Sequence, residues 1–243
     1  MSVWRNRLPN GEESHPLRCG ATVKGMALGL SLDRTRVLDA ARECGFELAG
    51  IAPALPVPEA GHFRSWVGRG MAAGMTYLTD SRADVRMDPR NLLPSAQSVI
   101  CVGKLYNRPE LYSTEFPRPE RGWISRYAWG QDYHAVLREG LERLAGRLRE
   151  LVPAPFEYRI CVDTAPLLER SYARLAGLGW IAKNTCLINQ ERGSWFFLGE
   201  MLTSLELEPD SPPEDRCGSC TRCIDACPTA AIVPAGHSGG PQW

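Results

Sequence analysis

The sequence predicts an α/β domain followed by a short cysteine-rich segment. Apolar runs with the period of strands alternate with amphipathic stretches with the period of helices between residues 31 and 208. Beyond that region, four of the nine cysteines lie between Cys217 and Cys227. We therefore divide the chain into a start over residues 1–30, an α/β domain over residues 31–208 and a cysteine-rich segment over residues 209–243.

The first regular pattern begins after a polar start. Residues 1–30 have no helical or strand period, and we interpret them as disordered or mis-assigned. At Ser31 a capping sequence precedes apolar residues at helical spacing, and Gly45 ends this helix. A strand pattern follows over residues 46–51.

The later elements continue this alternation. The clearest helix spans residues 132–151, where leucines recur at steps of three and four residues. Two prolines end it, and a strand pattern comes next. The remaining expected elements are helices over residues 60–71 and 165–176 and strands over residues 98–102, 157–162, 185–188 and 194–198.

The composition is that of a chain able to bury a sizeable core. Hydrophobic residues make up 44% of the 243 residues and charged residues 23%. The 28 basic and 28 acidic residues balance, so charge alone does not indicate a general nucleic-acid binder, although a local basic patch stays open. No apolar run has the length of a membrane span and no signal peptide is recognisable, so we expect a cytoplasmic protein without a membrane partner.

The cysteine run has the spacing C-x2-C-x2-C-x3-C-P, which is typical of bacterial iron–sulfur proteins. Thiolates are soft ligands, and this spacing lets Cys217, Cys220 and Cys223 converge on one cluster while Cys227 points elsewhere. A structural zinc site and a disulfide staple are the alternatives. Zinc normally uses two separated ligand pairs, and disulfide frameworks belong to small secreted chains, so the run favours a cluster.

The ligand set of this run is incomplete for two clusters. In two-cluster ferredoxins the fourth cysteine of such a run ligates the second cluster, together with a second cysteine run. No second run follows Pro228. Either Cys227 completes a single cluster or the natural protein continues beyond this chain. We expect a truncated chain, because a tail rich in glycine and proline adds little apolar surface to a cluster-binding lobe.

Five further cysteines are scattered singly along the chain. A single cysteine is most often a small core residue. We therefore expect no ligands among Cys19, Cys44, Cys101, Cys161 and Cys186.

Polar residues that could act in catalysis or binding gather in a few segments outside the cysteine run. Asp163 lies at the junction of an expected strand and helix, where it either acts in catalysis or only caps the helix. A glycine-punctuated turn brings Lys183 to the start of a strand, and the alternative is a helix end at Gly177 with an exposed lysine. His134 lies in a loop segment rich in arginine and aromatic residues, as a base or as a surface residue.

Taken together, these segments resemble one family. Its members are the epoxyqueuosine reductases, and the resemblance runs from about Ser31 to Val233. The segments that carry it, in order and spacing, are residues 124–134, 163–170, 176–180 and 193–200 and the cysteine run.

The resemblance implies a nitroreductase-related α/β domain that binds cobalamin, followed by a partial ferredoxin-like lobe for 4Fe-4S clusters, two in the family. It also implies the reaction, which is removal of the epoxide oxygen from epoxyqueuosine in tRNA to give queuosine. An electron donor such as flavodoxin or ferredoxin would supply electrons through the clusters to the cobalt. The family continues with a second cysteine run and a tRNA-gripping extension, so this chain is expected to be inactive or impaired.

The family's functional positions transfer to this chain by its motifs. The proton donor falls on Asp163, where burial beside the corrin would raise the carboxyl pKa and favour a general acid. Asp163 thereby also belongs to the cofactor site. The cluster ligands fall on Cys217, Cys220, Cys223 and Cys227. The implied cobalamin contacts are Arg86, Arg126, Lys183, Leu187 and Leu198.

Three other functions remain open at this stage. The first is a cobalamin and iron–sulfur reductase acting on a small molecule, as in reductive dehalogenases. The second is an electron-transfer module, which leaves the segments around Asp163 and Lys183 unexplained. The third is a nonfunctional remnant that folds without assembling its clusters.

Overall fold

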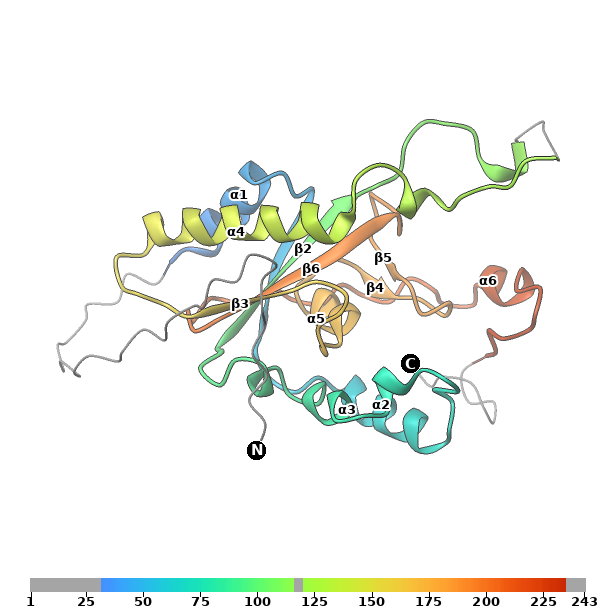
Figure 1. Ribbon diagram of the computed structural model, residues 1–243, viewed down its shortest axis with the longest axis horizontal. Helices are drawn as coiled ribbons and strands as arrows, with labels where there is room; N and C mark the ends of the chain where they lie inside the picture. The colour runs from blue at the N-terminus through green and yellow to red at the C-terminus, as the bar shows by residue number, and fades with distance from the viewer. Residues whose placement is uncertain (1–31, 116–119, 235–243) are drawn as a thin grey trace, which may run out of the picture. The chain divides into compact units, whose positions relative to one another are not determined.

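The computed structural model describes residues 32–115 and 120–234, and its centre is a four-stranded antiparallel sheet (Figure 1). The strand order is β1-β2-β6-β3, so the last of these strands in the sequence lies in the interior of the sheet. Every paired neighbour in it is antiparallel. The strands are β1 (Leu48–Pro53), β2 (Ser98–Leu105), β3 (Tyr158–Cys161) and β6 (Phe196–Thr203).

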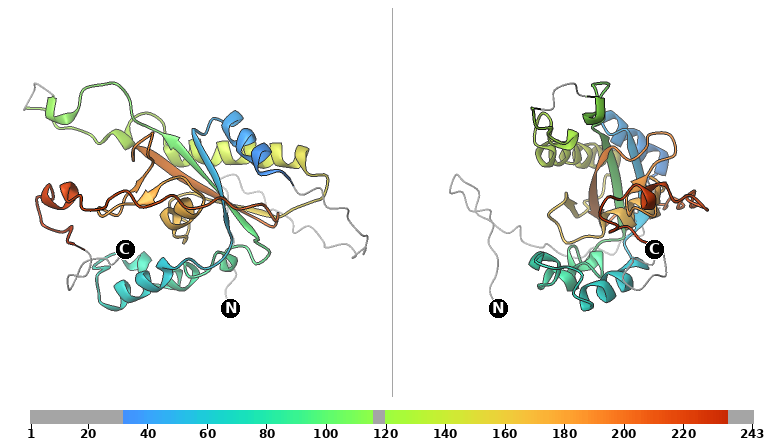
Figure 2. Two further views of the ribbon diagram at one scale, coloured as in Figure 1. Left: turned by 180° about the vertical axis from the view of Figure 1, so that it is seen from behind. Right: turned by 90° about the vertical axis from the view of Figure 1, so that its right-hand side faces the viewer.

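One face of the sheet is covered by α1 (Arg34–Glu43) and α4 (Tyr133–Leu151), which Figures 1 and 2 show together on the same side. The leucine stripe of α4 faces the sheet, and Leu137, Leu141 and Leu144 are fully buried. Burial of each such side chain contributes about 1.5–3 kcal/mol. The amphipathic period of this helix therefore fixes which of its faces packs on the strands.

Side-chain caps define where both helices begin. Asp33 accepts a hydrogen bond from the Thr35 amide at the start of α1, and Asp132 accepts one from the His134 amide at the start of α4. Each cap satisfies a backbone donor that the first helical turn leaves without a partner.

The opposite face is covered by the short helix α5 (Glu169–Leu175). Its Tyr172 is fully buried and donates a hydrogen bond from its hydroxyl to the Leu55 carbonyl, 2.8 Å away. Smaller elements surround this face or follow it. They are α2 (Glu59–Gly68), α3 (Arg82–Val85), β4 (Trp180–Ile181), β5 (Leu187–Ile188), α6 (Arg222–Asp225) and 3-10 turns at residues 76–78, 89–91, 113–115 and 126–128.

The mixture of helices and strands agrees with the expected class, but the sheet differs from the parallel arrangement that alternating elements usually give. β6 inserts between β2 and β3, so strands that follow each other in the sequence are not all neighbours. β6 also runs on to Thr203, past the expected end at residue 198. The expected strand was too short because Gly199 and the buried Glu200 interrupt the apolar pattern. β5 pairs with β4 in a separate two-stranded sheet.

The expected helix over residues 165–176 starts later, at Glu169. Pro166 disfavours a helical conformation of Ala165, and the Leu167 amide bonds to the Ala165 carbonyl in a turn instead. Asp163 is therefore not the helix cap, and that alternative is wrong. The expected start over residues 1–30 lies outside the described residues, and no described helix is long and apolar enough to cross a membrane.

The close approach of α5 to β1 generates a test of the fold. A Cβ added to Gly50 would lie 1.9 Å from the Ala176 carbonyl oxygen, whereas one added to Gly61 in α2 would meet nothing within 4 Å. We expect Gly50→Ala to lower the free energy of unfolding by about 2 kcal/mol or more and Gly61→Ala to raise it by about 0.5 kcal/mol. Urea unfolding measures both changes, and equal midpoints for the two variants would contradict this packing.

Candidate active site

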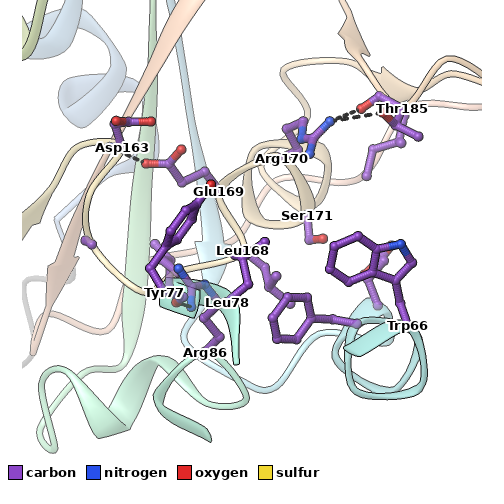
Figure 3. A pocket seen from close by; sticks show the side chains of 15 residues that line it. Trp66, Tyr77, Leu78, Arg86, Asp163, Leu168, Glu169, Arg170, Ser171 and Thr185 are labelled. Carbon is purple, nitrogen blue, oxygen red and sulfur yellow. Dashed lines mark hydrogen bonds between the residues drawn. The ribbon is translucent and has the colours of Figure 1, made fainter. Parts of the chain in front are cut away.

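A cavity of about 380 Å³ opens between α5 and the α2–α3 region (Figure 3). Phe63, Trp66 and Leu168 give it apolar walls. Arg86, Asp163 and Glu169 are charged groups that line the same space. An apolar hollow with a few convergent charged groups is the usual form of a small-molecule site.

Asp163 lies at this cavity on a strained turn directly after β3. Its φ is +52°, a region that non-glycine residues rarely adopt. The Thr164 amide donates to the Val162 carbonyl at 2.6 Å and closes a three-residue turn around Asp163. Strain of this kind collects at functional sites, because the surrounding structure must hold it in place. We call residues 162–164 the Asp163 turn.

Two residues in the first turn of α5 form hydrogen bonds to strained residues of other segments at the cavity wall (Figure 3). Glu169 Oε1 accepts a hydrogen bond from the Asp163 amide at 2.7 Å. Arg170 donates to the Thr185 carbonyl and to its hydroxyl, and Thr185 has a φ of +65°. Both strained residues line the cavity. Helix α5 therefore fixes the backbone on two sides of the site.

An imidazole flanks the Asp163 carboxylate. His134 Nε2 lies 3.1 Å from Asp163 Oδ2, and His134 Nδ1 lies 2.7 Å from Asp132 Oδ1. The hydrogen bond with Asp132, and then that with Asp163, raises the pKa of His134 above its ordinary value. The protonated imidazole is the form that can deliver a proton to Asp163.

The neighbouring Tyr133 completes the surroundings of the carboxylate. Its ring stacks on Phe197 with the centroids 4.2 Å apart. Burial, followed by the nearby charge of Asp163, raises the pKa of the Tyr133 hydroxyl to about 12. Tyr133 therefore stays a neutral hydrogen-bond donor at any pH at which the protein works.

Two more carboxyl groups lie beneath the Asp163 turn. Burial, opposed by the hydrogen bond from the Asp163 amide and supported by the charge of Asp163, raises the pKa of Glu169 to about 7. Glu200 is fully buried on β6, and its pKa is raised far more by burial and by Glu169. These are the two described glutamates with the most altered acidity, and sequence analysis singled out neither.

Comparison with known proteins places this site in a family. Residues 86–164 match the family model described as "Epoxyqueuosine reductase QueG, DUF1730". An epoxyqueuosine reductase from Xanthomonas campestris pv. campestris is 44% identical over 201 residues, which are 82% of this chain and 56% of the relative. The chain belongs to the epoxyqueuosine reductase family.

Solved structures of epoxyqueuosine reductases are similar as well. The Streptococcus thermophilus enzyme has a TM-score of 0.72 and 35% identity and covers 82% of this chain and 53% of its own. A crystal structure of epoxyqueuosine reductase with an epoxyqueuosine-modified tRNA-Tyr stem loop has a TM-score of 0.72 and 33% identity, covering 86% and 53%. This chain thus spans little more than half the length of these relatives.

A more distant likeness concerns the fold alone. A catabolic reductive dehalogenase has a TM-score of 0.51 and 16% identity and covers 81% of this chain and 25% of its own. The epoxyqueuosine reductases and the dehalogenase therefore share the arrangement of the domain described here.

The cobalamin contacts implied by the family are not gathered in one place. Arg86 lines the cavity, is 8% exposed and donates to the Tyr77 carbonyl at 3.0 Å, and burial lowers its pKa. Leu187 is buried on β5 and Leu198 half-buried on β6, both in the core beside α5. Their roles toward a cofactor remain predictions.

Arg126 has a structural role in this chain. Both terminal guanidinium nitrogens bond to the loop before it, at Asn107 Oδ1 and at three backbone carbonyls. The guanidinium also lies over the rings of Tyr112, Trp129 and Trp195, 4.7–5.4 Å from their centroids. Arg126 thus organises an aromatic loop, and a cofactor contact from it stays a prediction.

Lys183 reaches the cysteine loop, which we define as residues 217–227. Its Nζ donates to the Gly218 carbonyl at 2.7 Å and to the Cys220 carbonyl at 3.0 Å. Gly177 ends α5 with a φ of +79°, as the alternative interpretation of this segment expected. Lys183 is nevertheless not free, because it ties the loop to the domain.

The cysteine loop supplies the donor chemistry of a cluster site. The four thiols are exposed or half-exposed, and the Ile232 amide, followed by the hydroxyl and amide of Thr229, lowers the pKa of Cys227 to about 7. A thiolate is the form that ligates iron. Within the described residues, no three His, Cys, Asp or Glu side chains are arranged to hold a metal ion. The ligand types fit a cluster, and their convergence remains a prediction.

The single cysteines agree with expectation in part. Cys44, Cys101 and Cys161 are buried, whereas Cys186 is exposed and its prediction as a core residue is wrong. Cys19 lies outside the described residues.

The tie between Lys183 and the cysteine loop generates a second test. Each of its hydrogen bonds contributes about 1 kcal/mol, so we expect Lys183→Met to speed amide exchange in residues 217–223 about fivefold or more. The matched control is Lys104→Met, because Lys104 pairs with Glu47 away from this loop. Hydrogen–deuterium exchange measures both, and unchanged exchange in the Lys183 variant would contradict the tie.

Proposed function

We propose that this chain is the catalytic part of an oxidoreductase that reduces epoxyqueuosine to queuosine in tRNA, with Asp163 as the proton donor. The observation that carries this proposal is the Asp163 turn at the cavity, held by Glu169 and flanked by His134. Family membership supports the same reaction, and a relative is known in complex with an epoxyqueuosine-modified tRNA stem loop.

The cavity, at about 380 Å³, has the chemistry to receive part of a large amphiphilic cofactor such as cobalamin. Its apolar walls would pack against the corrin, and the Arg86 guanidinium would donate to polar groups at the periphery. Arg126, Lys183, Leu187 and Leu198 stay as proposed contacts. The thiolates of Cys217, Cys220, Cys223 and Cys227 would ligate 4Fe-4S clusters. When bound, the clusters and cobalamin supply the electrons that the reduction consumes.

The residues of this chain would then donate and replace the protons that the reduction consumes. Loss of the epoxide oxygen as water takes two electrons and two protons. The Asp163 carboxyl, with its side chain 56% exposed, is free to reach a substrate oxygen and protonate it as it leaves. His134, at 3.1 Å, returns a proton to Asp163. Tyr133 stacks on Phe197 and on the His134 ring, which covers one face of the imidazole.

The proposed partners follow from the same reaction. The substrate is tRNA carrying epoxyqueuosine, and the electron donor is a small redox protein such as flavodoxin or ferredoxin. Both occur in the cytoplasm, where we place the protein. Because the chain spans little more than half of its relatives, tRNA affinity is expected to depend on contacts outside residues 32–234.

Metal analysis tests the cofactor part of this proposal. After anaerobic reconstitution with iron, sulfide and cobalamin, we expect about one cobalt per chain and iron bound by the cysteine run. About four irons would indicate that Cys227 completes a single cluster. Absence of both cobalt and iron would contradict the cofactor assignment.

Asp163→Asn tests the proton donor. Removal of a general acid lowers turnover by about 10²–10⁴-fold, so we expect this variant to retain cobalt and iron while losing reduction of an epoxyqueuosine-containing stem loop. Asp84→Asn is the matched control, because Asp84 is exposed and pairs only loosely with Arg64 at 3.3 Å. Unchanged turnover in Asp163→Asn would remove the proton-donor role.

A further inference from the structure

The Asp163 backbone depends on one acceptor. Its amide bonds to Glu169 Oε1 at 2.7 Å, which joins the Asp163 turn to the first residue of α5. Without that acceptor the amide would lack a hydrogen-bond partner, and one of the interactions that stabilise the positive φ of Asp163 would be lost. The position of the Asp163 carboxyl therefore follows from the position of the Glu169 carboxyl.

The carboxyl of Glu200 lies deeper and has no hydrogen-bond partner on either oxygen among the described residues. Glu200 sits on β6 directly between Cys101 on β2 and Cys161 on β3 in the strand register. All three are fully buried beneath α5. An ionised carboxylate without a partner in such surroundings is very costly, so Glu200 carries a proton.

We infer that Glu169 is the positioning residue of Asp163. Glu200 lies deeper, and Glu169 is the neighbour whose charge raises the pKa of Glu200. Glu169 in turn presents Oε1 to the Asp163 amide. This inference rests on the proposed function only where it concerns turnover.

The charged and titratable groups around the pair come from every element packed on it. Asp163 and Arg170 act on Glu169, and Glu169 acts on Glu200. Glu200 in turn raises the pKa of Cys101 and Cys161, on which Arg159 and Arg138 act in the opposite sense. Burial is the largest influence that favours the neutral form of each glutamate, and Glu169 adds to it at Glu200.

The hold on Asp163 depends on pH with a defined sign. The raised pKa of Glu169, about 7, means that the neutral form prevails below neutrality. Its contribution to folding stability is complete below pH 4.5 and is lost as the pH rises through 7. The carboxylate that then forms is the stronger acceptor for the Asp163 amide. The Asp163 turn is therefore held most firmly above pH 7.

Amide exchange tests the positioning role without cofactor or tRNA. In the full chain, we expect Glu169→Ala to speed exchange of the Asp163 amide at least tenfold. Glu169→Gln retains an acceptor oxygen and is expected to stay within about threefold of the wild type. Glu191→Gln is the control, because Glu191 is exposed in a distant turn. Equal exchange in the wild type and Glu169→Ala would overturn the inference.

Carbon-13 titration of labelled glutamate carboxyls tests the protonation of Glu169. We expect one carboxyl to titrate near pH 7 and its transition to vanish in Glu169→Gln. Absence of a glutamate transition near pH 7 in the wild type would overturn the pH dependence of the hold on Asp163.

Turnover separates this inference from the proposed function. We expect Glu169→Ala to lose at least tenfold in turnover and Glu169→Gln to recover most of it at pH 6–7. Full turnover of Glu169→Ala with fast Asp163 exchange would overturn the positioning role while leaving Asp163 as the donor. Full turnover of Asp163→Asn would remove the proposed function, whereas the exchange result for Glu169 would stand.

Discussion

The placement of β6 between β2 and β3 constrains the rest of the structure. It pairs with β2 over eight residues and with β3 over four. Its side chains alternate between the two faces, so Met201 packs beneath α4 while Leu202 packs beneath α5. The same alternation puts Glu200 on the α5 face. The strand that completes the core therefore also carries a buried carboxyl to the underside of the site.

Helix α5 connects this buried layer to the residues that line the cavity. Its Tyr172 anchors it in the core, and its first two residues, Glu169 and Arg170, reach outward to the Asp163 turn and to Thr185. Two strained backbone positions at one cavity are thus held by adjacent side chains of a single helix. Strain at a site persists only when the surroundings over-determine it, and a core-anchored helix provides that determination.

Much of this arrangement was accessible from the sequence, and the exceptions have physical causes. The leucine period located α4 to within a residue, because helix periodicity reflects one buried face. β6 was cut short at Leu198, because a fully buried Glu200 does not look like part of a core strand. Asp163 could be singled out as a candidate from its motif, but the raised pKa values of Glu169 and Glu200 follow mainly from their burial, which no local pattern records.

Ionisation of the buried Glu169 has opposite effects on the stability of the fold and on the positioning of Asp163. A neutral Glu169 suits the low-dielectric surroundings and stabilises the fold, whereas an ionised Glu169 binds the Asp163 amide more strongly but must remain beside Glu200. A glutamine at position 169 would avoid the conflict, yet it would also remove the titration. Ionisation of Glu169 near neutral pH therefore lowers the stability of the fold while it holds the Asp163 turn more firmly.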